Sequence, residues 1–145
     1  MVSLVHTCMV LFCFCNLTSC NLTPTYYGPG GCHAANHACL ALLPLLIMCE
    51  PSDLGTECIY PGETRSRNAR LMFYERHEHG VGLAEQVFAV MQHLLILTLE
   101  HVQSCPCDDR RGCPKCVQSP FCREHNEVSD KQAAIIILKM LISQR

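Results

Sequence analysis

Charge is scarce in this sequence, and an uninterrupted apolar run of membrane length is absent from it. Charged residues make up 17% of the 145 residues, whereas apolar residues make up 49%. This balance supplies enough apolar side chains for one folded core and argues against a wholly disordered chain. Because no run reaches the roughly 18 apolar residues that a conventional transmembrane helix needs, we expect no membrane partner.

Several enzyme signatures are missing as well. The chain has no Gly-x-x-x-x-Gly-Lys-Ser/Thr phosphate loop, no His-Glu-x-x-His helix motif and no Gly-x-Ser-x-Gly elbow. At 145 residues it is also too short for a motor ATPase with two nucleotide-binding lobes. We therefore expect no catalysis from this chain alone.

Basic residues are missing from the N-terminal part, since no lysine or arginine precedes Arg65. The formal net charge of the chain is −2, which does not favour nucleic-acid binding by the molecule as a whole. The C-terminal part nevertheless carries a basic strip, diluted by interspersed acidic residues. We expect weak contacts with DNA phosphates, if any, from Arg110, Arg111, Lys115 and Lys131.

Hydrophobic periodicity predicts three helices. Residues 32–49 are apolar on nearly every side, which indicates a buried helix that Pro44 should kink or split. Residues 83–103 carry a broad apolar face typical of a core helix. A last helix is predicted over 129–142, with a capping box formed by its first residue, Ser129, and Gln132.

Between the helices, residues 70–75 predict a buried strand that leads into a glycine turn, and residues 50–68 predict a loop. The fold class expected is α+β, with a small sheet packed against helices. Residues 1–30 fit none of this and are interpreted as an unassigned N-terminal extension, with one domain over 31–145. The first fifteen residues of the extension superficially resemble the apolar region of a signal peptide but lack a basic start and a clear cleavage site.

Cysteine is abundant, and five of the thirteen cysteines crowd into eighteen residues as Cys105-x-Cys107-x5-Cys113-x2-Cys116-x5-Cys122. Four thiolates around one ion are the ligand set of structural zinc, and a Cys-x-x-Cys turn aims two sulfurs at one point. Five cysteines are one too many for a tetrahedral ion. The symmetric spacing favours one zinc ion held by Cys107, Cys113, Cys116 and Cys122, with Cys105 as the alternate ligand.

Other interpretations of the cysteines remain open. A secreted protein with disulfides would need an oxidising compartment, and the odd number of cysteines would leave one thiol unpaired within the chain. A redox-active Cys-x-x-Cys lacks the strand that normally precedes it. An iron–sulfur cluster uses the same ligands as the zinc site.

The histidines offer a further alternative. His33 and His37 lie four residues apart, so on a helix they share one face, and Asp53 could join them in a hydrolytic metal centre. His77 and His79 flank the predicted glycine turn and could also contribute. The simpler interpretation, which we favour, is that these histidines are hydrogen-bonded residues of helix packing and of the turn.

The order of these motifs resembles a known family. Three C-terminal segments carry the likeness: residues 104–109 with Cys-Pro-Cys, residues 112–122 with Gly-Cys-Pro-Lys-Cys-Val-Gln-Ser-Pro-Phe-Cys, and residues 126–134 with Asn…Asp-Lys. Upstream, His33-Ala-Ala-Asn-His37 and Asp53-Leu-Gly fall in the same order. The sequence is thus similar to the C-terminal zinc-binding domain of MrfA-type DEAD/DEAH-box DNA helicases over residues 31–143.

This resemblance implies an accessory zinc module beside two motor lobes, in a nuclear or cytoplasmic protein that unwinds DNA in the 3′–5′ direction with ATP and acts in DNA repair. The motor lobes are absent here, so ATP belongs only to a complete relative. The sequence departs from the family at residues 77–82, where the family usually has a Pro-Gly-Gly turn, and at Arg110-Arg111, which lengthens the loop before the Cys-x-x-Cys turn.

Overall fold

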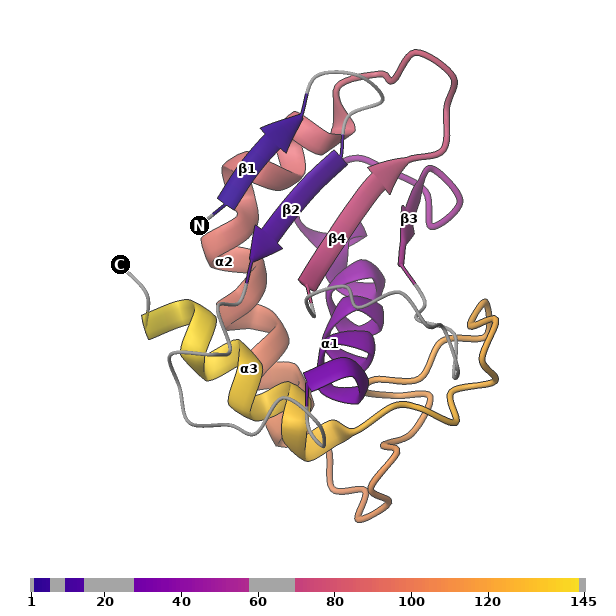
Figure 1. Cartoon of the computed structure of the whole chain (residues 1–145), viewed down its shortest axis with the longest axis vertical. Helices are drawn as coiled ribbons and strands as arrows, with labels where there is room; N and C mark the ends of the chain where they lie inside the picture. The colour runs from indigo at the N-terminus through magenta and orange to yellow at the C-terminus, as the bar shows by residue number, and fades with distance from the viewer. Residues whose placement is uncertain (1, 6–9, 15–27, 58–69, 144–145) are drawn as a thin grey trace.

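Helices cover one face of a four-stranded antiparallel sheet, which gives a two-layer α+β molecule (Figure 1). The computed structural model describes residues 2–5, 10–14, 28–57 and 70–143. Its elements in chain order are β1 (Val2–Val5), β2 (Val10–Phe14), α1 (Gly28–Leu42), the short 3-10 helix η2 (Leu43–Leu45), β3 (Leu54–Thr56), β4 (Arg70–Glu75), α2 (Leu83–Ser104) and α3 (Lys131–Ser143). The expected fold class is confirmed.

The sheet has the strand order β1-β2-β4-β3, so β4 lies between β2 and β3. Burial alternates along β4, where Leu71, Phe73 and Glu75 are buried and the residues between them are half-buried. This period of two turns one face of the strand toward the helices. The buried Glu75 carboxylate accepts the backbone N–H groups of Val81 and Ala84 (2.9 Å for Ala84), which fixes the start of α2 beside the end of β4.

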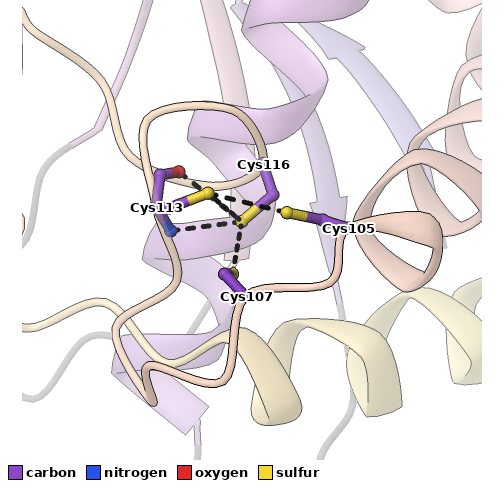
Figure 2. A group of neighbouring side chains, drawn as sticks. All are labelled: Cys105, Cys107, Cys113 and Cys116. Carbon is purple, nitrogen blue, oxygen red and sulfur yellow. Dashed lines mark hydrogen bonds between the residues drawn. The ribbon is translucent and has the colours of Figure 1, made fainter.

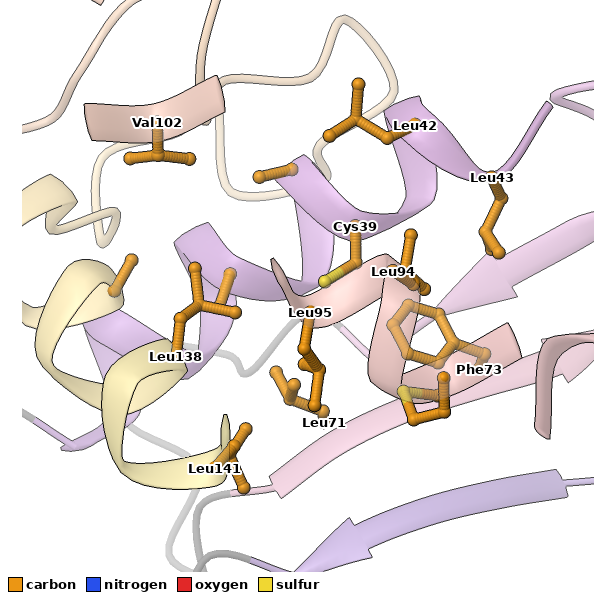
Figure 3. Packing of buried hydrophobic residues seen from close by; sticks show 14 of the residues in the cluster. Cys39, Leu42, Leu43, Leu71, Phe73, Leu94, Leu95, Val102, Leu138 and Leu141 are labelled. Atoms are coloured by element: carbon orange, nitrogen blue, oxygen red, sulfur yellow. The ribbon is translucent and has the colours of Figure 1, made fainter. Parts of the chain in front are cut away.

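Helix α1 lies at the centre of the helical layer and contacts α2, α3, β3 and β4. Small residues on α1 permit this crowding. A Cβ atom added at Gly31 would come within 2.7 Å of the Ala133 Cβ on α3, so the two helices meet closely there. Figure 3 shows the core that results, in which side chains of α1, α2, α3 and β4 meet around Phe73 and Leu95.

Helix α2 packs its stripe of buried residues, from Leu83 to Val102, against the rest of the core. By length and composition alone it is the one helix in the described ranges that could cross a bilayer. Its contacts with α1, α3 and the sheet are those of a core helix.

The structure departs from the sequence-based expectation in two places. Strand β3 forms inside the predicted loop 50–68, of which residues 58–69 lie outside the described residues. Within the predicted extension 1–30, β1 and β2 pair with each other, β2 pairs with β4, and α1 begins at Gly28. The sequence pattern of β1, β2 or β3 alone does not reveal these pairings, because a short apolar strand is specified largely by the strand beside it.

Other expectations are confirmed. The predicted strand 70–75 is β4, and the helix predicted over 83–103 is α2, one residue longer. Pro44 ends regular α-helix as expected, since α1 stops at Leu42 and Pro44 lies in the short 3-10 turn that follows.

The cap of α3 differs from the predicted capping box. The Ser129 hydroxyl is buried and has no hydrogen-bond partner among the described residues, whereas Asp130 Oδ1 accepts the Ala133 N–H at 2.9 Å. Asp130 Oδ2 also accepts Arg110 Nε at 2.9 Å. A carboxylate at this position satisfies a free N–H and suits the positive end of the helix dipole better than a hydroxyl does.

Replacing Asp130 with alanine should therefore lower the free energy of unfolding by about 1–2 kcal/mol, because the first turn of α3 loses its cap. Urea denaturation of the zinc-loaded chain measures this change. The matched control is Gln132→Ala at an exposed position of the same turn, which should leave the stability nearly unchanged. An equal loss of stability in both variants would contradict the Asp130 cap and favour the predicted Ser129–Gln132 capping box.

Candidate metal centre

The loop that joins α2 to α3 gathers four cysteine side chains. Cys105 follows the last residue of α2, Cys107 comes two residues later, and Cys113 and Cys116 form the Cys-x-x-Cys turn. Their sulfurs point toward one another (Figure 2). The Sγ–Sγ distances are 3.5 Å from Cys105 to Cys113, 3.6 Å from Cys107 to Cys116 and 3.7 Å from Cys113 to Cys116. All four sulfurs lie within 4.8 Å of one another.

These distances fit a tetrahedral metal site. Zinc–sulfur bonds of about 2.3 Å in a regular tetrahedron place the sulfurs about 3.8 Å apart. The observed separations are close to that edge and far longer than the roughly 2.05 Å of a disulfide bond. The four cysteines are free in the structure. This geometry favours the metal-binding interpretation of the cluster over the disulfide interpretation.

One member of the expected set is different. The structure replaces Cys122 with Cys105 in the four-sulfur cluster, and places Cys122 beside His33 instead. Cys105, the alternate ligand of the sequence-based prediction, is brought to the cluster because it directly follows the last residue of α2, next to the turn. The Cys-Pro-Cys sequence is the signal for Cys105 and Cys107 as a pair, since two cysteines one residue apart can reach the same ion from one side of the loop.

Local backbone geometry shapes the Cys-x-x-Cys turn. Gly112 has a φ of 71°, and a Cβ atom there would collide with the Val117 side chain, so the position requires glycine. The Cys113 N–H donates to Cys116 Sγ at 3.2 Å, and the Cys116 N–H donates to the Cys113 carbonyl at 3.0 Å. From α2, His101 Nε2 donates to the Lys115 carbonyl at 2.7 Å. The turn is thereby held against α2 in the shape that presents both sulfurs.

Lys131, at the first position of α3, contacts the cluster from outside. Its Nζ donates to the carbonyl oxygens of Cys105 and Cys107, both at 2.8 Å, and lies 3.3 Å from Cys107 Sγ. The residue is only 5% exposed. A buried ammonium offsets part of the negative charge of four thiolates. Lys131, which the sequence placed among the residues expected to contact DNA, is thus buried against the cysteine loop in this structure.

The cysteines of the cluster differ in acidity. A hydrogen bond from the Cys107 backbone, together with neighbouring thiols, lowers the pKa of Cys105 to about 7. Burial raises the pKa of Cys116 to about 12. An isolated thiolate is therefore disfavoured at Cys116, and a divalent cation would remove that penalty because it neutralises the sulfur charge directly.

The remaining basic residues of the predicted strip stay at the surface. The Arg110 side chain is 64% exposed and pairs with Asp130, and the Arg111 side chain is 56% exposed and lies 3.9 Å from Asp109. Lys115 is exposed on the Cys-x-x-Cys turn. These three side chains could reach a phosphate, although two of them already have an acidic neighbour.

The structure does not assemble the hydrolytic centre considered from the sequence. His33 and His37 are buried on α1 with their ring centroids 4.4 Å apart, as expected from their spacing, and burial lowers the pKa of both rings, that of His37 to about 4. Asp53 instead pairs with His77, with 3.0 Å between Oδ1 and Nε2. The third side chain beside the two histidines is Cys122, which sequence reasoning assigned to the other cluster.

Comparison with known proteins places the cluster in a family. The family model of the MrfA Zn-binding domain matches residues 35–117, which include all four cysteines of the cluster. An ATP-dependent helicase of Schizosaccharomyces pombe, hrq1, is 36% identical over 132 residues, and HRQ1 of Saccharomyces cerevisiae is 33% identical over 122 residues. The matches cover 81% and 78% of this chain but only 12% and 11% of the two yeast proteins.

A third relative has a different size. An uncharacterized protein of Methanocaldococcus jannaschii is 35% identical over 116 residues, which are 77% of this chain and 99% of the archaeal protein. Among solved structures, the DUF1998 helicase MrfA bound to DNA matches with a TM-score of 0.64 at 19% identity, over 92% of this chain and 16% of that one, which shows the shared fold. Together with the four converging sulfurs, these matches show that the chain belongs to the MrfA Zn-binding domain family.

Proposed function

We propose that the four-sulfur cluster binds one structural Zn²⁺ ion through Cys105, Cys107, Cys113 and Cys116. The convergence of four free sulfurs at tetrahedral spacing carries this assignment. No position is left open for substrate on an ion with four protein ligands, so its role is to stabilise the fold. The ion links the end of α2, through Cys105, to the Cys-x-x-Cys turn. The hydrogen bonds of Lys131 to the Cys105 and Cys107 carbonyls connect this site to α3.

The module as a whole is an accessory domain of an ATP-dependent DNA helicase. The support is the match to two yeast helicases and the fold shared with a DNA-bound helicase. ATP binding, 3′–5′ unwinding and the role in DNA repair reside in the motor lobes, to which this module docks. The archaeal relative consists almost entirely of the matched region, which supports a module that can also exist as its own chain.

DNA contact by the module itself is weak and comes from Arg110, Arg111 and Lys115. The exposed arginine side chains support this assignment, while their acidic partners reduce the positive potential there. Free thiols at spacing suited to metal fit a reducing compartment, either nucleus or cytoplasm.

A chimeric helicase tests the accessory role. The matching region of S. pombe hrq1 is replaced by this chain's residues, and ATP-dependent unwinding of a DNA duplex is measured. The chimera should unwind DNA, because the module provides the same docking surface and metal site. A matched chimera with Cys113→Ser and Cys116→Ser should lose both its four-sulfur zinc and most of its unwinding. A folded, zinc-loaded chimera that binds ATP but does not unwind DNA would contradict the accessory role.

The ligand assignment predicts opposite behaviour for two cysteines. Cys105→Ser should abolish the intense absorption that Co²⁺ acquires from four thiolate ligands, because it removes one of the four sulfurs. Cys122→Ser should leave that absorption intact. Titration of the metal-free chain with one equivalent of Co²⁺ measures both. Loss of the absorption in Cys122→Ser but not in Cys105→Ser would show that Cys122, not Cys105, is the fourth ligand.

Lys131 should matter for stability beyond its helical position. Lys131→Met removes the donor to two partly buried carbonyl oxygens and a sulfur, so the free energy of unfolding of the zinc-loaded chain should fall by about 2–3 kcal/mol. Guanidinium denaturation provides the measurement. Lys139→Met, at an exposed position of the same helix, is the control and should change stability by less than about 0.5 kcal/mol. Equal effects would mean that the Lys131 contacts contribute nothing specific.

A further inference from the structure

A second group of ligand-type side chains lies outside the four-sulfur cluster. His33 and His37 come from one face of α1, and Cys122 comes from the loop beyond the Cys-x-x-Cys turn. His33 Nε2 lies 3.2 Å from Cys122 Sγ, and the three candidate ligand atoms lie within 4.8 Å of one another. The two groups share no residue.

This trio is buried to an unusual degree for polar side chains. His33 is 0% exposed, His37 4% and Cys122 7%. Hydrogen bonding alone does not explain the arrangement, because the buried Nδ1 of His33 has no partner among the described residues. A histidine that is buried for its hydrogen bonds normally uses both ring nitrogens. A metal ion bound at Nε2, the nitrogen that faces Cys122, would offset part of the cost of burying the ring, although it would leave Nδ1 without a partner in the described part of the chain.

The surroundings of the sulfur resemble those of the first cluster. The Asn126 backbone N–H donates to Cys122 Sγ at 3.3 Å, just as the Cys113 N–H donates to Cys116 Sγ. Asn126 has a φ of 61°, and its side-chain amide is held by both backbone groups of Ser119, at 2.9 and 3.0 Å. Such outer contacts orient a ligand and stabilise the negative charge of a metal-bound thiolate.

The donor set indicates the kind of ion. Two imidazole nitrogens and one thiolate match the ligands that zinc takes in proteins, with one position left over. A cavity of about 280 Å³ is lined by His37 and by three residues close to Cys122, namely Ser119, Phe121 and Arg123. Of the three side chains only His37 lines this cavity, so a water molecule there could supply a fourth ligand from the His37 side.

We propose that His33, His37 and Cys122 bind a second zinc ion, which fastens α1 to the loop at residues 119–126. Asp53 takes no part, because it pairs with His77. The proposal concerns residues outside the four-sulfur cluster, so it stands independently of the function of the first site.

Counting metal in the purified 145-residue chain tests this proposal. Elemental analysis of the chain expressed with zinc and dialysed against metal-free buffer should find two zinc ions per chain. His33→Ala and, separately, Cys122→Ala should each retain one ion, which Co²⁺ replaces with the spectrum of four thiolate ligands. Cys113→Ser should also retain one ion, whose Co²⁺ spectrum shows mixed nitrogen and sulfur ligands.

The matched control is Cys39→Ala, a buried thiol of α1 that belongs to neither group, and it should keep two ions. Circular dichroism establishes that each variant remains folded, and the count in the unaltered chain is independent of any variant's folding. One zinc ion per folded unaltered chain would overturn the proposal. Two ions retained by His33→Ala or by Cys122→Ala would overturn it as well.

Discussion

Four sulfur atoms that converge on one point are the constraint on which the C-terminal half of this molecule depends. The segment between α2 and α3 spans residues 105–130 and forms neither helix nor strand in the structure. Its backbone hydrogen bonds are mostly short-range turn contacts, such as Cys122 N–H to the Ser119 carbonyl, and a segment of this length loses much conformational entropy on ordering. Bonds from four thiolates to the proposed ion would add stabilisation, since metal binding and folding are coupled in such loops.

Backbone hydrogen bonds also connect the start of α3 to this loop and to the start of α1. The Lys131 N–H donates to the Arg110 carbonyl at 2.9 Å, and the Asp130 N–H donates to the Gly30 carbonyl at 3.2 Å. The first turn of α3 is thus bonded both to the metal loop and to the start of α1. Because α1 is buried by the sheet and by two helices, the loop's geometry is transmitted to the whole helical layer. The start of α3 is therefore positioned by two neighbouring elements at once, the cysteine loop and α1.

Sequence reasoning was most successful where the signal was local and periodic. Strand β4 was predictable from an apolar run, and helix α2 from a broad apolar face. The end of regular α-helix near Pro44 was predictable because proline lacks the backbone N–H that a helix needs. Strand β3, by contrast, exists because β4 pairs with it, and no three-residue pattern announces such a partner. The cysteine spacing predicted a cluster of metal ligands, but it left the choice between Cys105 and Cys122 to the three-dimensional arrangement. Cys105 and Cys122 differ in which elements carry them, and only the three-dimensional arrangement brings Cys122 to His33, 89 residues away.

Hydrogen exchange of the first two turns of α3, compared between the zinc-loaded chain and the Cys113→Ser chain, tests the central claim most directly. If the four-sulfur ion fastens α3, the amides of residues 133–138 should exchange many times faster in the variant, while those of β4 in the core stay protected. Equal protection of α3 in both chains would contradict the claim and would show that core packing alone holds the helix in place.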